Sequence, residues 1–214
     1  MSIVATFNGM SIVALPSDTV PGCPAYTSLE LDTREAVAAN ASPFTGQTQT
    51  YDWQASWWEG QVSLPPMVHA NADVWQAFLM QCRGQSNAFL LGNPKATTPR
   101  GAPSGVPVVS GAGQTGYSLV TRGWTVKRFN LLRAGDSIQI GYRLYRVLNQ
   151  VDSDAGGDAT IAIWPNLRDQ PADGTPLVLN HCKGLFRLKN NSGNKFSINA
   201  GSYGFTGFAV QEAI

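Results

Sequence analysis

Residues 136–165, DSIQIGYRLYRVLNQVDSDAGGDATIAIWP, decide the fold class of this chain of 214 residues. Short apolar runs (IQI, LYRV and ATIAIW) alternate with Gly141-Tyr142 and with the Asp- and Gly-rich segment DSDAGGD. β-Branched and aromatic runs bounded by such residues are typical of strands joined by hairpin loops. Together with VPVV and GYSLVTRGWTV upstream, they predict four or five short strands. Because a closed sheet leaves no exposed edge, we predict that these strands form a small β-barrel.

Two proline-containing segments bound this barrel. GNPKATTPRGAPSGVP (92–107) has no apolar periodicity and NLRDQPADGTP (166–176) is polar, which is typical of junctions between domains. The residues that follow, 177–214, are too few to fold alone. We therefore predict that 100–176 is a domain inserted into a first domain made of residues 1–99 and 177–214.

The first domain is predicted to be a β-sheet. Apolar runs at 9–15 and 25–31 indicate two strands joined by a loop, PSDTVPGCP. Residues 32–50 are small and polar with Pro and Gly, and we interpret them as a long arm or hairpin whose ordering depends on another subunit. Residues 51–67 begin with four aromatic side chains and then alternate as a half-buried strand does, so we place them at the centre of the core. The aromatic residues are Tyr51, Trp53, Trp57 and Trp58.

One helix is predicted, at about 71–83. Asn71 is suited to cap its start, and Gly84 stands where a left-handed residue ends many helices. The apolar positions between them recur at helical spacing: Val74, Trp75, Phe78, Leu79 and Cys82. A helix of about three turns is marginal alone in water, so this apolar stripe requires a sheet to pack on. The predicted fold is therefore mainly β, with one helix in the sheet domain.

The charge balance argues against several classes of partner. Lys+Arg number 15 and Asp+Glu 14, a net charge of +1, so no strong field draws the chain to nucleic acid or to an anionic membrane. Only 14% of the residues are charged, which is low for a soluble monomer. Because charged groups are depleted at the cores of interfaces, such a surface suits burial against neighbouring subunits.

The cysteines and the N-terminus bear on where the chain folds. Cys23, Cys82 and Cys182 are an odd number at wide spacing, which indicates neither a disulfide framework nor a zinc cluster. The start, MSIVATFNGMSIVAL, is apolar but has no basic segment, and polar residues interrupt it. It predicts neither a signal peptide nor a membrane-spanning helix. We expect folding in a reducing cytoplasm and no insertion into a membrane.

Two loops resemble ligand-binding motifs. Gly111, Gly113 and Gly116 match the G-x-G-x-x-G pattern of dinucleotide-binding turns, but the residues after them favour a strand, whereas that motif must open a helix. DSDAGGD resembles the start of a calcium loop, yet it lacks the distal Glu that completes one, and Asp and Gly are also what hairpin turns select. Its carboxylates are Asp152, Asp154 and Asp158. We expect neither a cofactor nor a metal in these loops.

The two histidines are weak candidates for a reactive site. His69 and His181 are too few for a multi-histidine metal site, and His181 and Cys182 would point to opposite faces of a strand. Cys182 and His69 could form a nucleophile and base pair, although no local signature supports that pairing. We expect these three residues to be structural.

The tryptophan-rich segment admits two interpretations. Asp52 and Glu59 lie beside the tryptophans, so the segment could be a carbohydrate platform with a general acid. The alternative, which we favour, is a packed core in which Trp57 or Trp58 faces outward. An exposed tryptophan serves a subunit interface equally well. We therefore predict no enzymatic activity and assign no catalytic, cofactor-binding or metal-binding residue.

Several segments, taken together, resemble one family. They are YDWQASWWEGQVSLPPM, FLLGNP, PRGAPSGVPVVSGAGQTGYSLVTRGW, LLRAGDSIQIGYRLYRVL, ATIAIWPNLRDQPADGTPLV and GLFRL, which fall between about residues 51 and 190. As a set they resemble the distal tail proteins (Dit), tail-tip hub proteins of long-tailed bacteriophages. No single motif carries this resemblance.

The resemblance implies an architecture and an assembly. It implies an N-terminal β-sheet domain with a helix and a long belt-like hairpin, plus a second domain that in some members is a small OB-like β-barrel. Members form a ring, usually a hexamer, that joins the tail tube to the tip or baseplate. The implied partners are copies of the chain itself, the tail tube protein, hub or tail-tip proteins and, in some phages, a side-fibre or receptor-binding protein.

The implied location is the virion, after synthesis in the host cytoplasm without a signal peptide. The family offers no catalytic residue to carry over, and the resemblance does not identify the residues of the ring interface. We therefore carry two further hypotheses alongside a structural virion protein. One is a carbohydrate-binding module that contacts the host surface, and the other is a hydrolase that uses Asp52 or Glu59.

Overall fold

The computed structural model describes residues 2–95, 97–192, 196–199, 202–205 and 207–214. In these residues 46% of the chain is strand and 9% is helix, which confirms the predicted mainly β fold. The chain forms two compact units. The first comprises residues 1–32, 58–92 and 183–214, and the second comprises residues 33–57 and 93–182.

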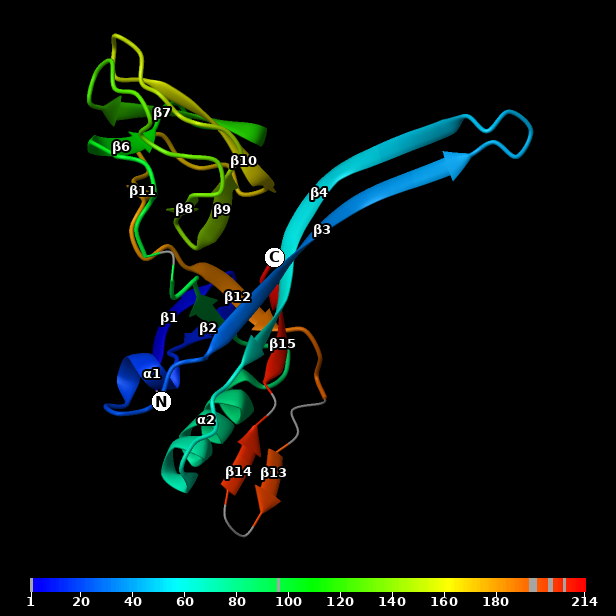
Figure 1. The fold of residues 1–214 in the computed structure, drawn as a ribbon, viewed down its shortest axis with the longest axis vertical. Coiled ribbons are helices and arrows are strands. Elements are labelled where there is room, and N and C mark those ends of the chain that lie inside the picture. Colours follow the sequence, from blue (N-terminus) through cyan, green and yellow to red (C-terminus); the bar gives the residue numbers. More distant parts are fainter. Residues whose placement is uncertain (1, 96, 193–195, 200–201, 206) are drawn as a thin grey trace. The chain divides into compact units, whose positions relative to one another are not determined.

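A seven-stranded sheet forms the centre of the first unit (Figure 1). Its strand order is β1-β2-β5-β12-β15-β4-β3, so β1 and β3 are its edges. The strands are β1 (Ile3–Phe7), β2 (Met10–Val13), β5 (Ala88–Leu91), β12 (Gly184–Leu188), β15 (Phe208–Glu212), β4 (Thr48–Ser63) and β3 (Ser28–Ala41). β2 and β5 run parallel, whereas β12 is antiparallel to both of its neighbours. A further hairpin joins β13 (Phe196–Asn199) to β14 (Ser202–Phe205).

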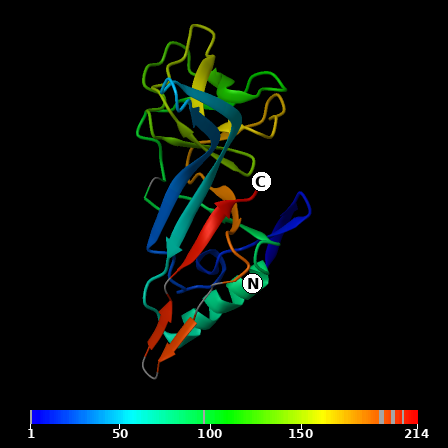
Figure 2. The same cartoon turned by 90° about the vertical axis from the view of Figure 1, so that its right-hand side faces the viewer.

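Helix α2 (His69–Cys82) supplies much of the core of this unit. Trp75 and Phe78 are fully buried on its inner face, and their rings contact Phe208 of β15. Phe89 of β5 meets Phe78 edge to face, with 5.2 Å between ring centroids. Such aromatic contacts add to the stabilisation that burial of the rings provides. Figure 2 shows α2 beside the β13–β14 hairpin.

The ends of α2 differ from the prediction. The helix begins two residues earlier, and its N-cap is Val68, which makes no side-chain capping bond. The expectation that Asn71 caps the helix is therefore wrong, because Asn71 lies inside it and donates to the carbonyl of Gly22. Arg83 is the left-handed C-cap, and Gly84 follows in the same conformation with φ +62°.

The start of the chain also differs in detail. The segment interpreted as a loop contains the short helix α1 (Pro16–Thr19), so the described residues contain two helices rather than one. Proline at the first turn lacks an N–H that would be unpaired there anyway, which favours a helix start. The strand expected at 25–31 begins at Ser28 and continues to Ala41, so most of the polar segment 32–50 belongs to β3 and β4.

The second unit contains a nearly closed six-stranded barrel. Its strand order is β11-β8-β9-β10-β7-β6. The strands are β6 (Gly105–Val109), β7 (Gly116–Trp124), β8 (Ser137–Ile140), β9 (Arg143–Val147), β10 (Ala159–Leu167) and β11 (Leu177–Val178). The runs IQI, LYRV and ATIAIW that predicted the barrel are β8, β9 and most of β10.

Closure of the barrel depends on the segment before β11. Val108 forms a bridge with Pro176, the amide of Val109 donates to the carbonyl of Thr175 at 2.9 Å, and the amide of Gly174 donates to Val109 at 3.0 Å. The interior is filled by apolar side chains from every strand of the barrel and from the connecting loops. Among the fully buried ones are Leu119, Leu131, Leu132, Ile138, Ile161 and Ile163.

All six barrel strands lie between β5 and β12 in the sequence. β5 and β12 are antiparallel neighbours, and Leu91 at the end of β5 pairs with Gly184 at the start of β12. The chain therefore leaves and re-enters the sheet at adjacent positions. Residues 92–183 take the place that a hairpin turn would otherwise occupy.

Candidate functional site

The parts of β3 and β4 that belong to the second unit form its candidate functional surface. Residues 33–57, here called the arm, run as a two-stranded ribbon to a tip loop (Figure 1). The amide of Ser42 donates to the carbonyl of Gln47 at 2.8 Å, and the amide of Gly46 donates to Ser42 at 2.9 Å. Gly46 has φ +69°, a conformation that glycine adopts without steric cost. The tip is thus a defined turn.

The arm exposes large apolar side chains. Phe44 at the tip is 96% exposed, and Tyr51, Trp53 and Val37 are also exposed. The rings of Tyr51 and Trp53 meet edge to face, with centroids 5.0 Å apart. Aromatic residues on such a surface commonly mark contacts with another molecule.

The tryptophan-rich segment is divided between the arm and the sheet. Trp58, Val62 and Leu64 are buried, as expected for residues at the centre of the core. Tyr51 and Trp53 are not, so the prediction is wrong for the first part of the segment. One of Trp57 and Trp58 was expected to face outward: Trp58 is only 5% exposed, whereas Trp57 is partly exposed.

A buried polar network joins the arm to the barrel strand β10. The hydroxyl of Ser56 donates to Oδ1 of Asn166 at 2.9 Å and accepts the backbone N–H of Asn166 at 2.9 Å. Nδ2 of Asn166 donates to the carbonyl of Gln54 at 2.6 Å, and the indole N–H of Trp164 donates to Glu35 at 2.8 Å. Because Ser56 and Asn166 are buried, these bonds fix the base of the arm on β10.

Sequence reasoning missed this network. Ser56 stands among tryptophans, and Asn166 opens a segment that was interpreted as a domain junction. Ser56 is one of several polar residues between the aromatic ones, with Asp52 and Gln54, so nothing in the local sequence marks it. Gln54 has φ +53°, an uncommon value for a residue other than glycine, and it marks the irregularity that turns its carbonyl to Asn166.

Beside the tip loop lies a polar hollow of about 370 Å³. It is lined by Asn40, Ala41, Ser42, Thr45, Gln47 and Gln49. These side chains offer amide and hydroxyl groups and no charge. Such groups suit hydrogen bonds to an uncharged polar ligand or to the backbone of another protein.

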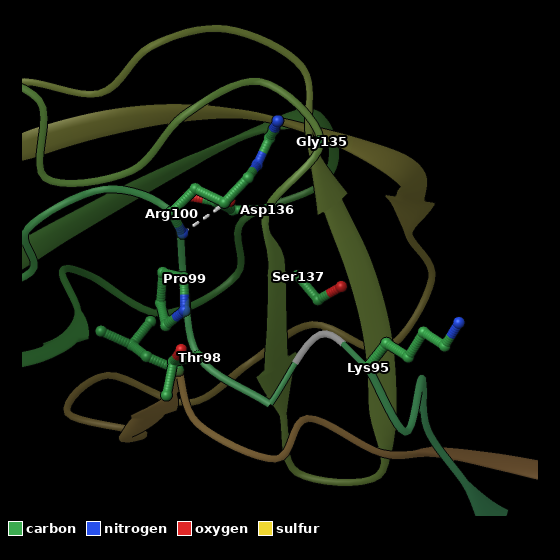
Figure 3. Close-up of a pocket in the computed structure, with 8 residues that line it drawn as sticks. Lys95, Thr98, Pro99, Arg100, Gly135, Asp136 and Ser137 are labelled. Atoms are coloured by element: carbon green, nitrogen blue, oxygen red, sulfur yellow. Dashed lines mark hydrogen bonds and ion pairs between the residues drawn. The ribbon is translucent and has the colours of Figure 1, made fainter.

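A second hollow, of about 160 Å³, lies against the barrel (Figure 3). It is lined by Lys95, Thr98, Pro99, Arg100, Gly135, Asp136, Ser137 and Leu179. Figure 3 shows the side chain of Arg100 directed to Gly135 and Asp136, whereas Lys95 lies on the other side of the hollow. The two cations therefore do not converge on one point, as a site for an anion would require.

Asp136 in this hollow anchors the entry loop of the barrel. Its side chain is 2% exposed and accepts hydrogen bonds from the amides of Arg133 (2.8 Å) and Arg100 (3.0 Å), and from Nε of Arg100 (3.2 Å). Burial by itself raises the pKa of Asp136, but these hydrogen bonds together outweigh it, so the pKa lies below its ordinary value. The carboxylate is ionised at neutral pH and structural.

The loops that resemble ligand-binding motifs have structural explanations. Gly116 is the first residue of β7, so the glycine pattern opens a strand, and its three glycines all have positive φ. In DSDAGGD, Oδ1 of Asp154 accepts the amides of Gly156 (2.7 Å) and Asp158 (2.9 Å), which closes a turn. Within the described residues there is no group of three or more His, Cys, Asp or Glu side chains that could hold a metal ion.

The histidines and the nearby cysteine have separate surroundings. Nδ1 of His69 lies 2.8 Å from Asp73, one turn along α2. His181 is exposed and is not part of a strand. Cys182 is buried with its Sγ 3.3 Å from the carbonyl of Ser137, and burial raises the pKa of its thiol to about 11. A thiol that stays protonated at neutral pH is a poor nucleophile.

The two carboxylates near the tryptophans also have local partners. Oδ1 of Asp52 accepts the amide of Gln54 at 2.7 Å on the exposed arm. Glu59 is ion-paired with Lys189 at 2.8 Å. Both contacts are typical of structural carboxylates, and neither raises the case for a general acid.

Comparison with known proteins does not identify the chain. No model of a known protein family matches it, and a search of curated proteins gives no match either. In the part of the chain that the structure describes, no helix is long and apolar enough to cross a membrane.

Proposed function

We propose that this chain is a structural, non-enzymatic subunit of a bacteriophage tail tip, a distal tail protein that assembles into a ring, usually a hexamer. The observation that carries the proposal is the arm, which exposes Phe44, Tyr51 and Trp53 on a two-stranded ribbon. The low charge of the whole chain and the resemblance of its sequence segments support the same proposal.

The arm is a two-stranded hairpin with two faces that need cover. An isolated two-stranded hairpin is marginally stable in water and cannot cover both of its own faces. Here the base is held by Asn166, while the aromatic residues further out remain open to solvent. A second copy of the chain would cover them. A contact of an arm with a different surface of the next copy is head-to-tail, and such contacts form a ring when the rotation between successive copies closes.

The proposed role fixes partners and location. The ring would join the tail tube protein on one side to hub or tip proteins on the other, and the barrel would be available to a side-fibre or receptor-binding protein. The chain would be made in the host cytoplasm and act in the virion, without catalysis and without recognition of a nucleic-acid sequence.

Native mass spectrometry and electron microscopy of the purified chain test the proposal. We expect a concentration-dependent ring, and we expect Phe44→Ser with Trp53→Ser to reduce its formation because apolar contact area is lost. Val106→Ser is the matched control, since Val106 is an exposed apolar residue of the barrel. A wild-type chain that stays monomeric at every concentration, and is absent from tail particles, contradicts the proposal.

A carbohydrate-binding module is the second candidate function. It is favoured by the exposed pair Tyr51 and Trp53 and by the uncharged amide and hydroxyl groups of the hollow at the tip. Sugar rings stack on exposed aromatic faces, and uncharged polar groups can order their hydroxyls. Glycan-array binding that is lost in Trp53→Ala and kept in Val106→Ala would support this function. Trp58 is buried and would not serve as the test residue.

A further inference from the structure

One loop of the barrel presents a compact apolar and cationic surface. Residues 125–131, here called the basic loop, follow β7. Phe129 is 79% exposed and Val126 is 53% exposed. Lys127 and Arg128 stand between them and are also exposed. Aromatic residues and arginine are the side chains that most often anchor protein interfaces.

The backbone of the basic loop is held rigidly by residues 151–154. The amide of Lys127 donates to the carbonyl of Asp154 at 2.8 Å, and the amide of Leu131 donates to Val151 at 2.9 Å. Between these, Arg128 exchanges two bonds of 2.9 Å with Ser153, one through the serine hydroxyl and one through its amide. The loop is therefore ordered before any partner binds, which lowers the entropic cost of association.

Lys127 is held in a conformation that favours glycine. Its φ is +51°, and Asn130 in the same loop has φ +61°. Asparagine tolerates this region, but for lysine it is uncommon and costs on the order of 1 kcal/mol or more. The surrounding hydrogen bonds maintain this conformation of Lys127. The side chains of Lys127, Arg128 and Phe129 all face solvent.

The cationic side chains of the basic loop have no direct partner in the described part of the chain. No hydrogen bond or ion pair engages the side chains of Lys127 and Arg128 among the residues described. Two carboxylates of the neighbouring segment bind other groups: Asp152 accepts the amide of Asn130 at 2.6 Å and Nε2 of Gln150 at 3.0 Å, and Asp154 accepts two amides of its own turn. The loop thus presents two cations to any partner.

A complementary surface exists on β3. Most carboxylates of the described chain have a hydrogen bond or an ion pair, but Glu30 and Asp32 have none. They are exposed on an edge strand and alternate with Leu29 and Leu31, which are only half-buried. Because successive side chains of a strand point to opposite faces, Glu30 and Asp32 lie on one face and Leu29 and Leu31 on the other. This stretch, here called the acidic edge, therefore presents two carboxylates on one face. Within the described chain Asp158 has no hydrogen bond or ion pair through its side chain either, but it lies on the barrel and interacts electrostatically with Arg122.

We propose that the basic loop of one copy contacts the acidic edge of a second copy of this chain. The proposal rests on the proposed ring and adds a contact to it. The two surfaces differ, so each copy offers one of each, and the contact repeats head-to-tail around a ring. Complementary charge sets the register of the contact, while Phe129 and Val126 of the basic loop contribute apolar area.

Charge reversal with compensation tests this contact. Lys127→Glu with Arg128→Glu, or Glu30→Lys with Asp32→Lys, should each raise the dissociation constant of self-association about tenfold or more. All four substitutions in one chain restore opposite charges across the contact, so self-association should return to near the wild-type level. Sedimentation velocity over a concentration series measures the constant, and thermal unfolding confirms that each variant is folded. Lys95→Glu is the matched control.

The outcomes separate this proposal from the proposed ring. If the wild type forms rings and both reversed variants form them equally well, the contact is wrong and the ring stands. If the wild type never associates, the ring and the contact both fail. If dextran sulfate or single-stranded DNA binds the wild type but not the Lys127→Glu and Arg128→Glu variant, while self-association is unchanged, the basic loop serves an anionic polymer and the contact is overturned.

Discussion

At the scale of single residues, the polar side chains that are buried have the clearest consequences. Asn166 uses its side chain twice, as acceptor for the hydroxyl of Ser56 and as donor to the carbonyl of Gln54. Neither partner is replaced easily, because Ser56 and Asn166 are both buried. A polar group left unpaired in the interior costs more than the hydrogen bond itself contributed.

We therefore expect Asn166→Ala to destabilise the chain by about 2–3 kcal/mol, as unpaired buried groups do. Urea unfolding measures this change in the free energy of unfolding. Hydrogen exchange of the arm amides should also become faster, because the arm loses its fixed base. Asn40→Ala, at an exposed position of the arm, should change stability by less than about 0.5 kcal/mol. Equal effects of the two substitutions would contradict the role given to the network.

Asp136 predicts a dependence of stability on pH. Its pKa in the folded chain lies below the ordinary value of 3.8, so the ionised form stabilises the fold. That contribution is present above pH 3.8 and is lost as the pH falls through the lower pKa of the folded state. Urea unfolding of the wild type and of Asp136→Asn should therefore differ most at neutral pH and converge in acid. A difference that stays constant down to acidic pH would contradict this prediction.

At the scale of elements, one close backbone approach in the sheet lies between β4 and β3. A Cβ added to Gly60 would lie 2.1 Å from the carbonyl oxygen of Glu30, a backbone atom that cannot move without shifting a strand. The φ of Gly60 is not positive, so the constraint at this position is space and not conformation.

We expect Gly60→Ala to destabilise the sheet by about 1–3 kcal/mol, the usual cost of overpacking. Gly156→Ala is the control, because its φ is also not positive and its added Cβ would meet only the side chains of Asp154 and Asp158, at ordinary contact distances. Thermal unfolding of both variants measures the difference. If Gly156→Ala proves the more damaging change, the close approach of β3 and β4 is not a constraint.

The sequence predicted an element well where the local pattern of apolar and turn residues determines which side chains are buried. The barrel strands were predictable because IQI, LYRV and ATIAIW are apolar runs separated by turn residues, and they are buried as β8, β9 and β10. The arm was harder. Tyr51 and Trp53 have the same composition signal as Trp58, and only the tertiary structure determines which of them is covered.

The candidate site was predictable only in outline. The polar segment 32–50 indicated an arm, but two of its exposed aromatic residues, Tyr51 and Trp53, come from the segment assigned to the core. Asn166 and Ser56 are 110 positions apart, and no local pattern links two residues at that separation. The cap of α2 failed for a related reason, since the carbonyl of Gly22, distant in sequence, is the partner of Asn71.

At the scale of the whole molecule, the connection between β5 and β12 predicts how separable the barrel is. Leu91 and Gly184 are paired neighbours in the sheet, so an Asn-Gly turn in place of residues 93–182 should join β5 and β12 as an ordinary hairpin. We expect this deletion variant to unfold cooperatively on heating. The absence of a cooperative transition would show that the sheet depends on the barrel.

The same variant should have a less ordered arm. Removal of β10 takes away Asn166 and Trp164, which hold Gln54, Ser56 and Glu35. Hydrogen exchange should therefore be fast in the arm and slow in β5, β12 and β15. Protection of the arm equal to that in the full chain would mean that its order does not come from the barrel.

The paired ends of β5 and β12 also make this position an exchange point for whole domains. A graft needs only that its own N- and C-termini lie as close together as Leu91 and Gly184, two residues that face each other on paired strands. Any module that meets this condition could replace the barrel without lengthening the sheet. In a symmetric assembly each copy would carry one such module, so a single genetic change would decorate the particle at every subunit.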